Sequence, residues 1–125
     1  VRTLESLYYV GVKCIEKGCP GDVCQWEPYE RKYEYTFEDS IKAILDYMER
    51  FSLDNIQLGT SIIIVPGYEF KVVDVLVTNF HQPQSTLLLL ISAFVKGDWK
   101  NIYDFALKNE FRFLSYGDSS LLFRQ

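Results

Sequence analysis

The sequence predicts an α/β fold in which about four helices pack on a mixed sheet. Its 125 residues, 48% of them apolar, are enough to bury one core. Helical periodicity marks the first fifty residues, whereas short β-branched runs alternate with helical patterns after residue 58. The apolar content and the 16% of aromatic residues exclude a disordered or collagen-like chain. We therefore expect residues 1–125 to form a single domain.

Two helices are expected in the first half of the chain. Apolar residues recur at helical spacing over residues 1–15, and Gly18 is a stop signal. Thr36 with Asp39 three residues later forms a variant of the capping box, so a second helix should begin there. A loop lies between the two helices, with a short strand expected at residues 31–35.

The second half is expected to alternate strands with two further helices. Apolar or alternating runs predict strands at residues 61–65, 68–73, 75–77, 111–115 and 121–123. The stretch from Pro83 to Val95 is apolar nearly all round, which predicts a buried helix that begins at Pro83. Asp98 is the expected cap of the last helix.

Charge, hydropathy and cysteine content argue against several classes of protein: nucleic-acid-binding, membrane-spanning, disulfide-rich and zinc-binding. A net charge of −4 argues against nucleic-acid binding by this chain alone. The longest near-apolar stretch, residues 87–95, is about half of the ~20 residues that a membrane-spanning helix needs, so no membrane partner is expected. Cys14, Cys19 and Cys24 are too few for a disulfide scaffold and lack zinc-site spacing, so we expect a reducing cytoplasm and no metal.

The strongest candidate site is the turn that joins the strand at 75–77 to the apolar helix. Thr78, Asn79 and His81 lie in this turn, and Ser85 and Thr86 open the helix. Free N–H groups of a first helical turn stabilise a carboxylate or phosphate, and a histidine can transfer a proton near neutral pH. The alternative is that Ser85 and Thr86 only complete the helix start and that His81 is an ordinary turn residue.

Three further candidates are weaker. Asp74 lies within an apolar run, so its ionised form is disfavoured or needs a partner, unless the side chain points outward or bonds a backbone amide. Tyr116, Gly117 and Asp118 form a loop that could bind a ligand or be an ordinary tight turn. Arg2 belongs either to a solvated ion pair or to a phosphate contact.

Longer motifs carry a resemblance to a known family. VPGYEFKVVD at residues 65–74 is followed by TNFH at 78–81, PQSTLL at 83–88, SAF at 92–94 and FRFLSYGD at 111–118. In this order the motifs resemble the S-adenosylmethionine:tRNA ribosyltransferase-isomerases of queuosine biosynthesis. VRTLES at residues 1–6 resembles the end of another block of that family. Gln82 and Gln84 depart from it, because an apolar and a charged residue are frequent there.

The resemblance implies a transferase that moves and isomerises the ribosyl part of S-adenosylmethionine onto 7-aminomethyl-7-deazaguanine in tRNA, giving epoxyqueuosine. S-adenosylmethionine would be the ribosyl donor, and tRNA would bind through the full-length enzyme. The family has an α/β domain with an inserted β-barrel. The chain starts at Val1 inside a helical pattern, so we expect the C-terminal part of the α/β domain without the N-terminal part and barrel.

The resemblance also suggests roles for the candidate residues. His81 or Asp74 would be the general base, Ser85 and Thr86 would hold the methionine carboxylate or a tRNA phosphate, and residues 116–118 would line a ribose pocket. The alternative is a non-catalytic anion- or nucleotide-binding subdomain that is inert as an isolated piece. An open sheet edge would allow such a piece to self-associate.

Overall fold

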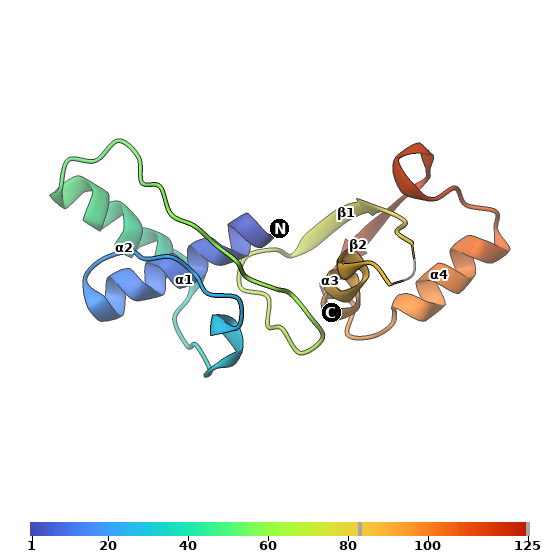
Figure 1. Cartoon of the computed structure of the whole chain (residues 1–125), viewed down its shortest axis with the longest axis horizontal. Helices are drawn as coiled ribbons and strands as arrows, with labels where there is room; N and C mark the ends of the chain where they lie inside the picture. The colour runs from blue at the N-terminus through green and yellow to red at the C-terminus, as the bar shows by residue number, and fades with distance from the viewer. Residues whose placement is uncertain (83, 125) are drawn as a thin grey trace. The chain divides into compact units, whose positions relative to one another are not determined.

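The computed structural model describes residues 1–82 and 84–124, with the Tyr116 side chain left out. The described residues form four α-helices and one two-stranded antiparallel sheet, so the predicted α/β class and helix number are confirmed (Figure 1). The chain divides into two compact units, Val1–Ile63 and Ile64–Gln125. No helix in the described part is long and apolar enough to span a membrane.

Two packed helices dominate the first unit. Helix α1 (Arg2–Lys17) ends at Gly18, as predicted, and α2 (Phe37–Arg50) follows the loop. The helices approach closely at Gly11, where a Cβ would overlap the hydroxyl and carbonyl oxygens of Ser40. The fully buried Ser40 hydroxyl donates to the Tyr8 carbonyl at 2.6 Å. A glycine is therefore required for this helix contact.

The capping box of α2 is formed as predicted. Thr36 Oγ1 accepts the Asp39 N–H at 3.1 Å, and Asp39 Oδ2 accepts the Thr36 N–H at 3.4 Å. Two N–H groups that have no intrahelical partner are thus satisfied by side chains. The start of this helix is encoded locally, within four residues.

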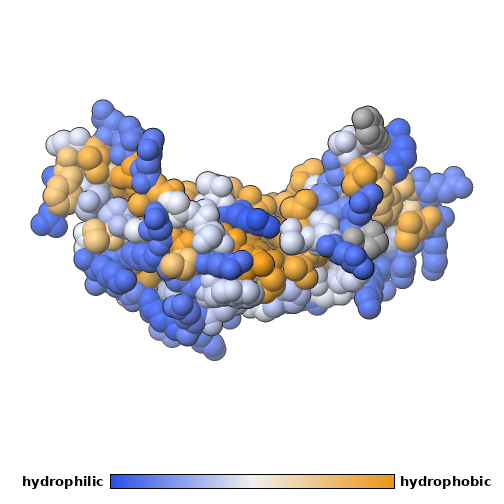
Figure 2. Space-filling view, in the orientation of Figure 1, coloured by the Kyte–Doolittle hydropathy of each residue, from blue (hydrophilic) through white to orange (hydrophobic). Residues whose placement is uncertain are grey.

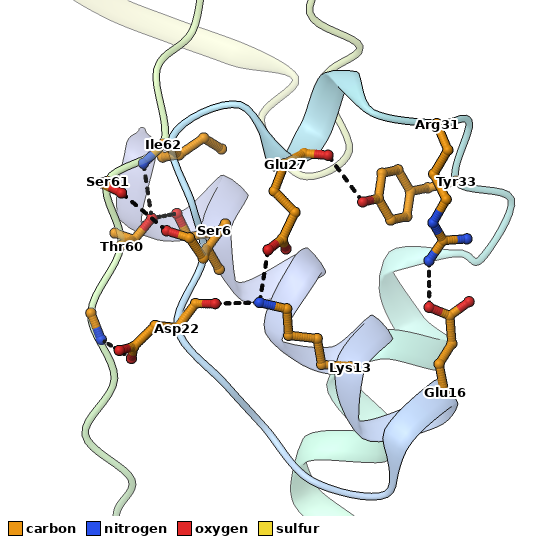
Figure 3. Close-up of polar contacts among 12 residues, drawn as sticks. Ser6, Lys13, Glu16, Asp22, Glu27, Arg31, Tyr33, Thr60, Ser61 and Ile62 are labelled. Carbon is orange, nitrogen blue, oxygen red and sulfur yellow. Dashed lines mark hydrogen bonds and ion pairs between the residues drawn. The ribbon is translucent and has the colours of Figure 1, made fainter.

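The loops of the first unit are held by polar contacts rather than by strands (Figure 3). Ser6 and Thr60 share a hydroxyl hydrogen bond of 2.7 Å, and Lys13 lies 2.8 Å from Glu27. Asp22 accepts the Gly59 N–H at 2.7 Å. The strands expected at 31–35 and 61–65 are not formed: the only described pairing here is an isolated parallel bridge between Val23 and Thr60, and a short 3-10 helix, η1 (Glu27–Tyr29), fills the loop.

The second unit contains the sheet. Strand β1 (Val75–Asn79) pairs antiparallel with β2 (Ser119–Phe123), from Val75 opposite Phe123 to Asn79 opposite Ser119. The sheet among the described residues is thus antiparallel and narrower than the mixed sheet expected. No strand is formed at 68–73 or 111–115, and the latter segment runs into a 3-10 helix, η2 (Leu114–Tyr116).

Two helices complete this unit. Helix α3 (Thr86–Phe94) begins after Ser85, three residues later than predicted, and Pro83 lies outside the described residues. Its second half is buried, as the apolar pattern predicts. Helix α4 (Trp99–Lys108) follows Asp98, whose carboxylate accepts from Asn101 Nδ2 at 2.6 Å and does not cap the helix N–H groups.

Candidate functional site

An aromatic cluster fixes the turn after β1. Thr78 and Asn79 end the strand, and the next residue, Phe80, is 3% exposed. Its ring meets Tyr103 edge-on at 5.3 Å and Phe111 at 5.7 Å between centroids, and Phe113 lies at 5.4 Å. Such aromatic contacts add to the free energy of burial and prefer defined angles. The backbone on both sides of Phe80 is therefore held by the core.

His81 is held at two points. Its backbone N–H donates to the Tyr103 hydroxyl at 2.9 Å, and its Nε2 lies 2.9 Å from Thr78 Oγ1. The Thr78 hydroxyl also donates to the Asn79 carbonyl at 3.3 Å. When the hydroxyl hydrogen points there, Thr78 accepts from Nε2–H and Nδ1 of His81 keeps a lone pair that can take a proton.

Strand β2 contributes hydroxyl groups beside the same turn. Ser119 Oγ donates to Asn79 Oδ1 at 3.0 Å, and Ser120 Oγ donates to the Thr78 carbonyl at 3.2 Å. These bonds follow from the register, which places Ser119 opposite Asn79 and Ser120 opposite Thr78. The structure thus brings Thr78, Asn79 and His81 together, as the sequence predicts.

The loop between residues 112 and 118 closes on itself. Asp118 Oδ2 accepts the Arg112 N–H at 2.9 Å, and the Asp118 N–H donates to the Arg112 carbonyl at 2.9 Å. The hydrogen bond from the Arg112 N–H, aided by its guanidinium, lowers the pKa of Asp118. A Cβ on Gly117 would overlap the Arg112 carbonyl. Gly117 and Asp118 thus have structural partners, while their ribose contacts and that of Tyr116 remain predictions.

Asp74 points outward and has a charged partner, which were two of the alternatives left open for it. Its side chain is 70% exposed, and its Oδ1 lies 2.5 Å from Arg124 Nη2. The Arg124 N–H also donates to the Asp74 carbonyl at 2.8 Å. Asp74 precedes β1 and Asn79 ends it, so the two are separated by about 16 Å at roughly 3.3 Å per residue. The contacts of Asp74 are with Arg124, whereas those of His81 are with Thr78 and Tyr103.

The helix start near the turn is partly occupied by its own cap. Ser85 Oγ accepts the Leu87 N–H at 3.2 Å, which is the capping alternative considered for this residue. Thr86 is the exposed first residue of α3. Anion binding at Ser85 and Thr86 remains a prediction. Arg2 is exposed on α1 in the other unit, and its phosphate contact also remains a prediction.

A groove of about 550 Å³ lies beside the turn. Its apolar lining includes Phe80, Ile102 and Phe111, and its polar lining includes Ser119 and Ser120. This volume falls in the range of roughly 300–1,000 Å³ typical of small-molecule sites. A larger pocket of about 670 Å³, lined by residues 66–70, 92–94, 96, 97 and 124, holds none of the predicted site residues.

Sequence reasoning missed Tyr103 and Arg112. Tyr103 shares helical spacing with Trp99 and Ala106, which marks it as a core residue but does not reveal the partner of its hydroxyl. Arg112 lies inside a motif of the resemblance, yet its contacts with Asp118 depend on loop closure. The described residues contain no cluster of three or more histidine, cysteine or acidic residues that could hold a metal ion.

A comparison with known families identifies the chain. Residues 36–122, which include the whole His81 turn and both strands up to Leu122, match the model of the family described as "Queuosine biosynthesis protein". The chain belongs to this family. Queuosine biosynthesis is a tRNA-modification pathway, so the family is one of tRNA modification.

Individual relatives carry one name. The chain is 60% identical over 62 residues to the S-adenosylmethionine:tRNA ribosyltransferase-isomerase of Chloroherpeton thalassium, which covers 48% of this chain and 18% of that protein. For the enzyme of the same name from Halothermothrix orenii, identity is 49% over 76 residues, covering 60% and 22%. The match therefore spans about a fifth of the length of each of these relatives.

A solved structure is also similar. The crystal structure of S-adenosylmethionine tRNA ribosyltransferase from Thermotoga maritima shares 30% identity with the chain at a TM-score of 0.48. The match covers 67% of this chain and 38% of that one.

Proposed function

We propose that this chain forms part of the active site of an S-adenosylmethionine:tRNA ribosyltransferase-isomerase. The observation that carries the proposal is the family match over residues 36–122, which includes the turn that holds His81. In this proposal the ribosyl part of S-adenosylmethionine passes to 7-aminomethyl-7-deazaguanine in a cytoplasmic tRNA and is isomerised. The products are epoxyqueuosine, adenine and methionine.

His81 is proposed as the general base. The reaction requires removal of an acidic proton from the carbon next to the sulfonium, and Nδ1 of His81 can accept it when Nε2 donates to Thr78. The imidazole contacts Thr78, and the backbone N–H of His81 donates to the Tyr103 hydroxyl. Asp74 is the weaker candidate because its carboxylate is exposed and paired with Arg124.

The remaining predicted residues are proposed to hold the substrate. The exposed hydroxyl of Thr86 and the positive end of the α3 dipole would bind the methionine carboxylate or a tRNA phosphate, while Ser85 caps the Leu87 N–H. The groove lined by Phe80, Ser119 and Ser120 has the size of a small-molecule site. In this proposal Asn79 and residues 116–118 would contact the ribose from outside its lining. No metal is part of the proposal.

A second candidate function applies to the chain by itself. Because it matches only about a fifth of the length of its relatives, the isolated chain would be a binding subdomain without turnover. Binding of an anion or nucleotide without catalysis would then be its whole activity.

A chimaera tests the proposed function. Residues 36–124 of this chain, the family match extended so that β2 and the Asp74–Arg124 pair stay intact, replace the corresponding segment of the Halothermothrix orenii relative. Adenine release is followed with S-adenosylmethionine and tRNA bearing the 7-aminomethyl-7-deazaguanine base. We expect adenine release that requires both substrates, with the unmodified relative as the control. A chimaera that folds, as judged by circular dichroism, but releases no adenine would contradict the proposal.

A further inference from the structure

Tyr103 is a core residue of the second unit whose hydroxyl has a backbone partner. Tyr103 is in the middle of α4 and is 8% exposed. Its oxygen accepts the His81 backbone N–H at 2.9 Å, across 22 residues of sequence. Burial raises the pKa of the phenol, so the hydroxyl is neutral over the pH range of ordinary assays.

Neighbouring rings fix the orientation of Tyr103. Phe80 meets it edge-on at 5.3 Å, and Trp99 and Phe113 each lie at 5.9 Å, also edge-on. Close packing in such a core leaves little freedom for the ring to turn. The hydroxyl is therefore presented at a fixed place to the residue that follows Phe80.

We propose that Tyr103 is a positioning residue for His81: its hydroxyl, on a ring fixed in the core, holds the His81 backbone and so determines where the imidazole lies. Thr78 can meet Nε2 only when the backbone of residue 81 is in place, because the two side chains are three residues apart at the end of a strand. The role of this contact in turnover rests on the proposed function. The contact itself does not.

Loss of the hydroxyl has a defined consequence. A phenylalanine ring fills the same space in the cluster, but the His81 N–H then loses its acceptor. A polar group left without a partner in a partly buried site shifts toward water, and a small displacement of a catalytic group is costly for the rate. Tyr103→Phe therefore separates the hydrogen bond from the packing.

Amide hydrogen exchange on the 125-residue chain provides the first test. In Tyr103→Phe, the His81 amide should exchange at least about tenfold faster. The Leu114 amide, which donates to the Phe80 carbonyl at 2.8 Å in the same cluster, should stay within about twofold of the wild-type rate. An unchanged His81 rate would overturn the proposal, as would equal acceleration of both amides, because that result indicates general loosening of the cluster.

The nitrogen chemical shifts of the His81 imidazole provide a second test, because a change in packing alone would not alter them. In the wild-type chain the two ring nitrogens should differ, because Nε2 has a fixed partner in Thr78. In Tyr103→Phe they should approach the values of a solvated histidine at the same pH. Unchanged shifts would overturn the proposal.

Turnover of the chimaera tests whether the Tyr103 contact matters for catalysis. Tyr103→Phe should lower kcat about tenfold while KM for S-adenosylmethionine stays within about twofold, because the base is displaced but the substrate is still bound. Tyr47→Phe, which removes a hydroxyl from α2, is the matched control and should leave both constants unchanged. An unchanged kcat in Tyr103→Phe would overturn the proposal. If the unsubstituted chimaera has no turnover, the proposed function fails, and the exchange and shift measurements still decide the role of Tyr103.

Discussion

The Asp118 carboxylate is expected to stabilise the 112–118 loop in a pH-dependent way. It accepts the Arg112 N–H and faces the Arg112 guanidinium, and these contacts lower its pKa. A carboxyl group whose pKa is lower in the folded state adds stability above its unfolded pKa, and that stability is lost as the pH falls through the folded pKa. The contribution should thus be complete at neutral pH and fade in acid.

Asp118→Asn tests this pH dependence. The substitution should lower the free energy of unfolding at pH 7, and the difference from wild type should shrink as the pH falls below about 4. Urea unfolding of both proteins from pH 7 to pH 3 measures the difference. A gap that stays constant over this range would show that the charge of Asp118 does not stabilise the loop.

The start of α3 allows capping and ligand binding to be separated. Ser85→Ala should destabilise the chain by about 1 kcal/mol, because the Leu87 N–H loses its acceptor, and Ser85→Asp should restore most of this stability. Aspartate at this position would also repel an anion bound at the helix start. Urea unfolding should therefore rank the variants differently from turnover of the chimaera. Equal turnover of the Asp variant and wild type would exclude an anion at this helix start.

A second prediction at the scale of the helices concerns the close contact between α1 and α2. Gly11→Ala should destabilise the chain by at least about 2 kcal/mol, because the new methyl group overlaps Ser40 and the helices must separate. Gly21→Ala is the control, since its Cβ would lie 3.4 Å from the flexible Lys13 side chain. Thermal and urea unfolding measure both variants. Similar losses in the two would contradict the close helix approach.

The helices could be predicted from the sequence because their signals are local. The periodicity of α1 and the capping box at Thr36 and Asp39 lie within a few residues of each other. Strands depend on a partner that periodicity does not specify. Residues 68–73 alternate as a strand would but have no ladder partner in the described part, whereas β1 finds its partner 40 residues away.

In the candidate site, too, local contacts could be predicted from the sequence and long-range contacts could not. Thr78 and His81 are three residues apart, so their meeting after a strand could be foreseen. The Tyr103 contact with His81 and the Asp74 contact with Arg124 span 22 and 50 residues, which a pattern of residue types does not encode. For Asp74 the sequence left open whether the side chain has a partner or points outward, and it could not name Arg124 as that partner.

At the scale of the whole molecule, patches of exposed apolar side chains interrupt the hydrophilic surface (Figure 2). One face of the sheet carries two directly opposed pairs, Val75 with Phe123 and Val77 with Leu121, and all four side chains are largely exposed. Exposed apolar patches of this kind are usual at surfaces that contact other chain segments. Self-association of the isolated chain remains a prediction that light scattering can measure.

The isolated chain should neither turn over nor bind its proposed substrate tightly. It matches about a fifth of the length of its relatives, and a net charge of −4 disfavours contact with tRNA phosphates. Calorimetric titration with S-adenosylmethionine should therefore give no stoichiometric binding. Clear one-to-one binding by the 125-residue chain would show that the pocket is complete within it.

The central claim is that the turn after β1 carries the base of a ribosyl transfer. Adenine release by the chimaera with His81→Ala or Asp74→Asn tests it most directly. We predict that His81→Ala lowers the rate at least about a hundredfold, as expected for loss of a general base, while Asp74→Asn retains most of the activity. Near-normal turnover in a folded His81→Ala protein, or a larger loss in Asp74→Asn, would contradict the account.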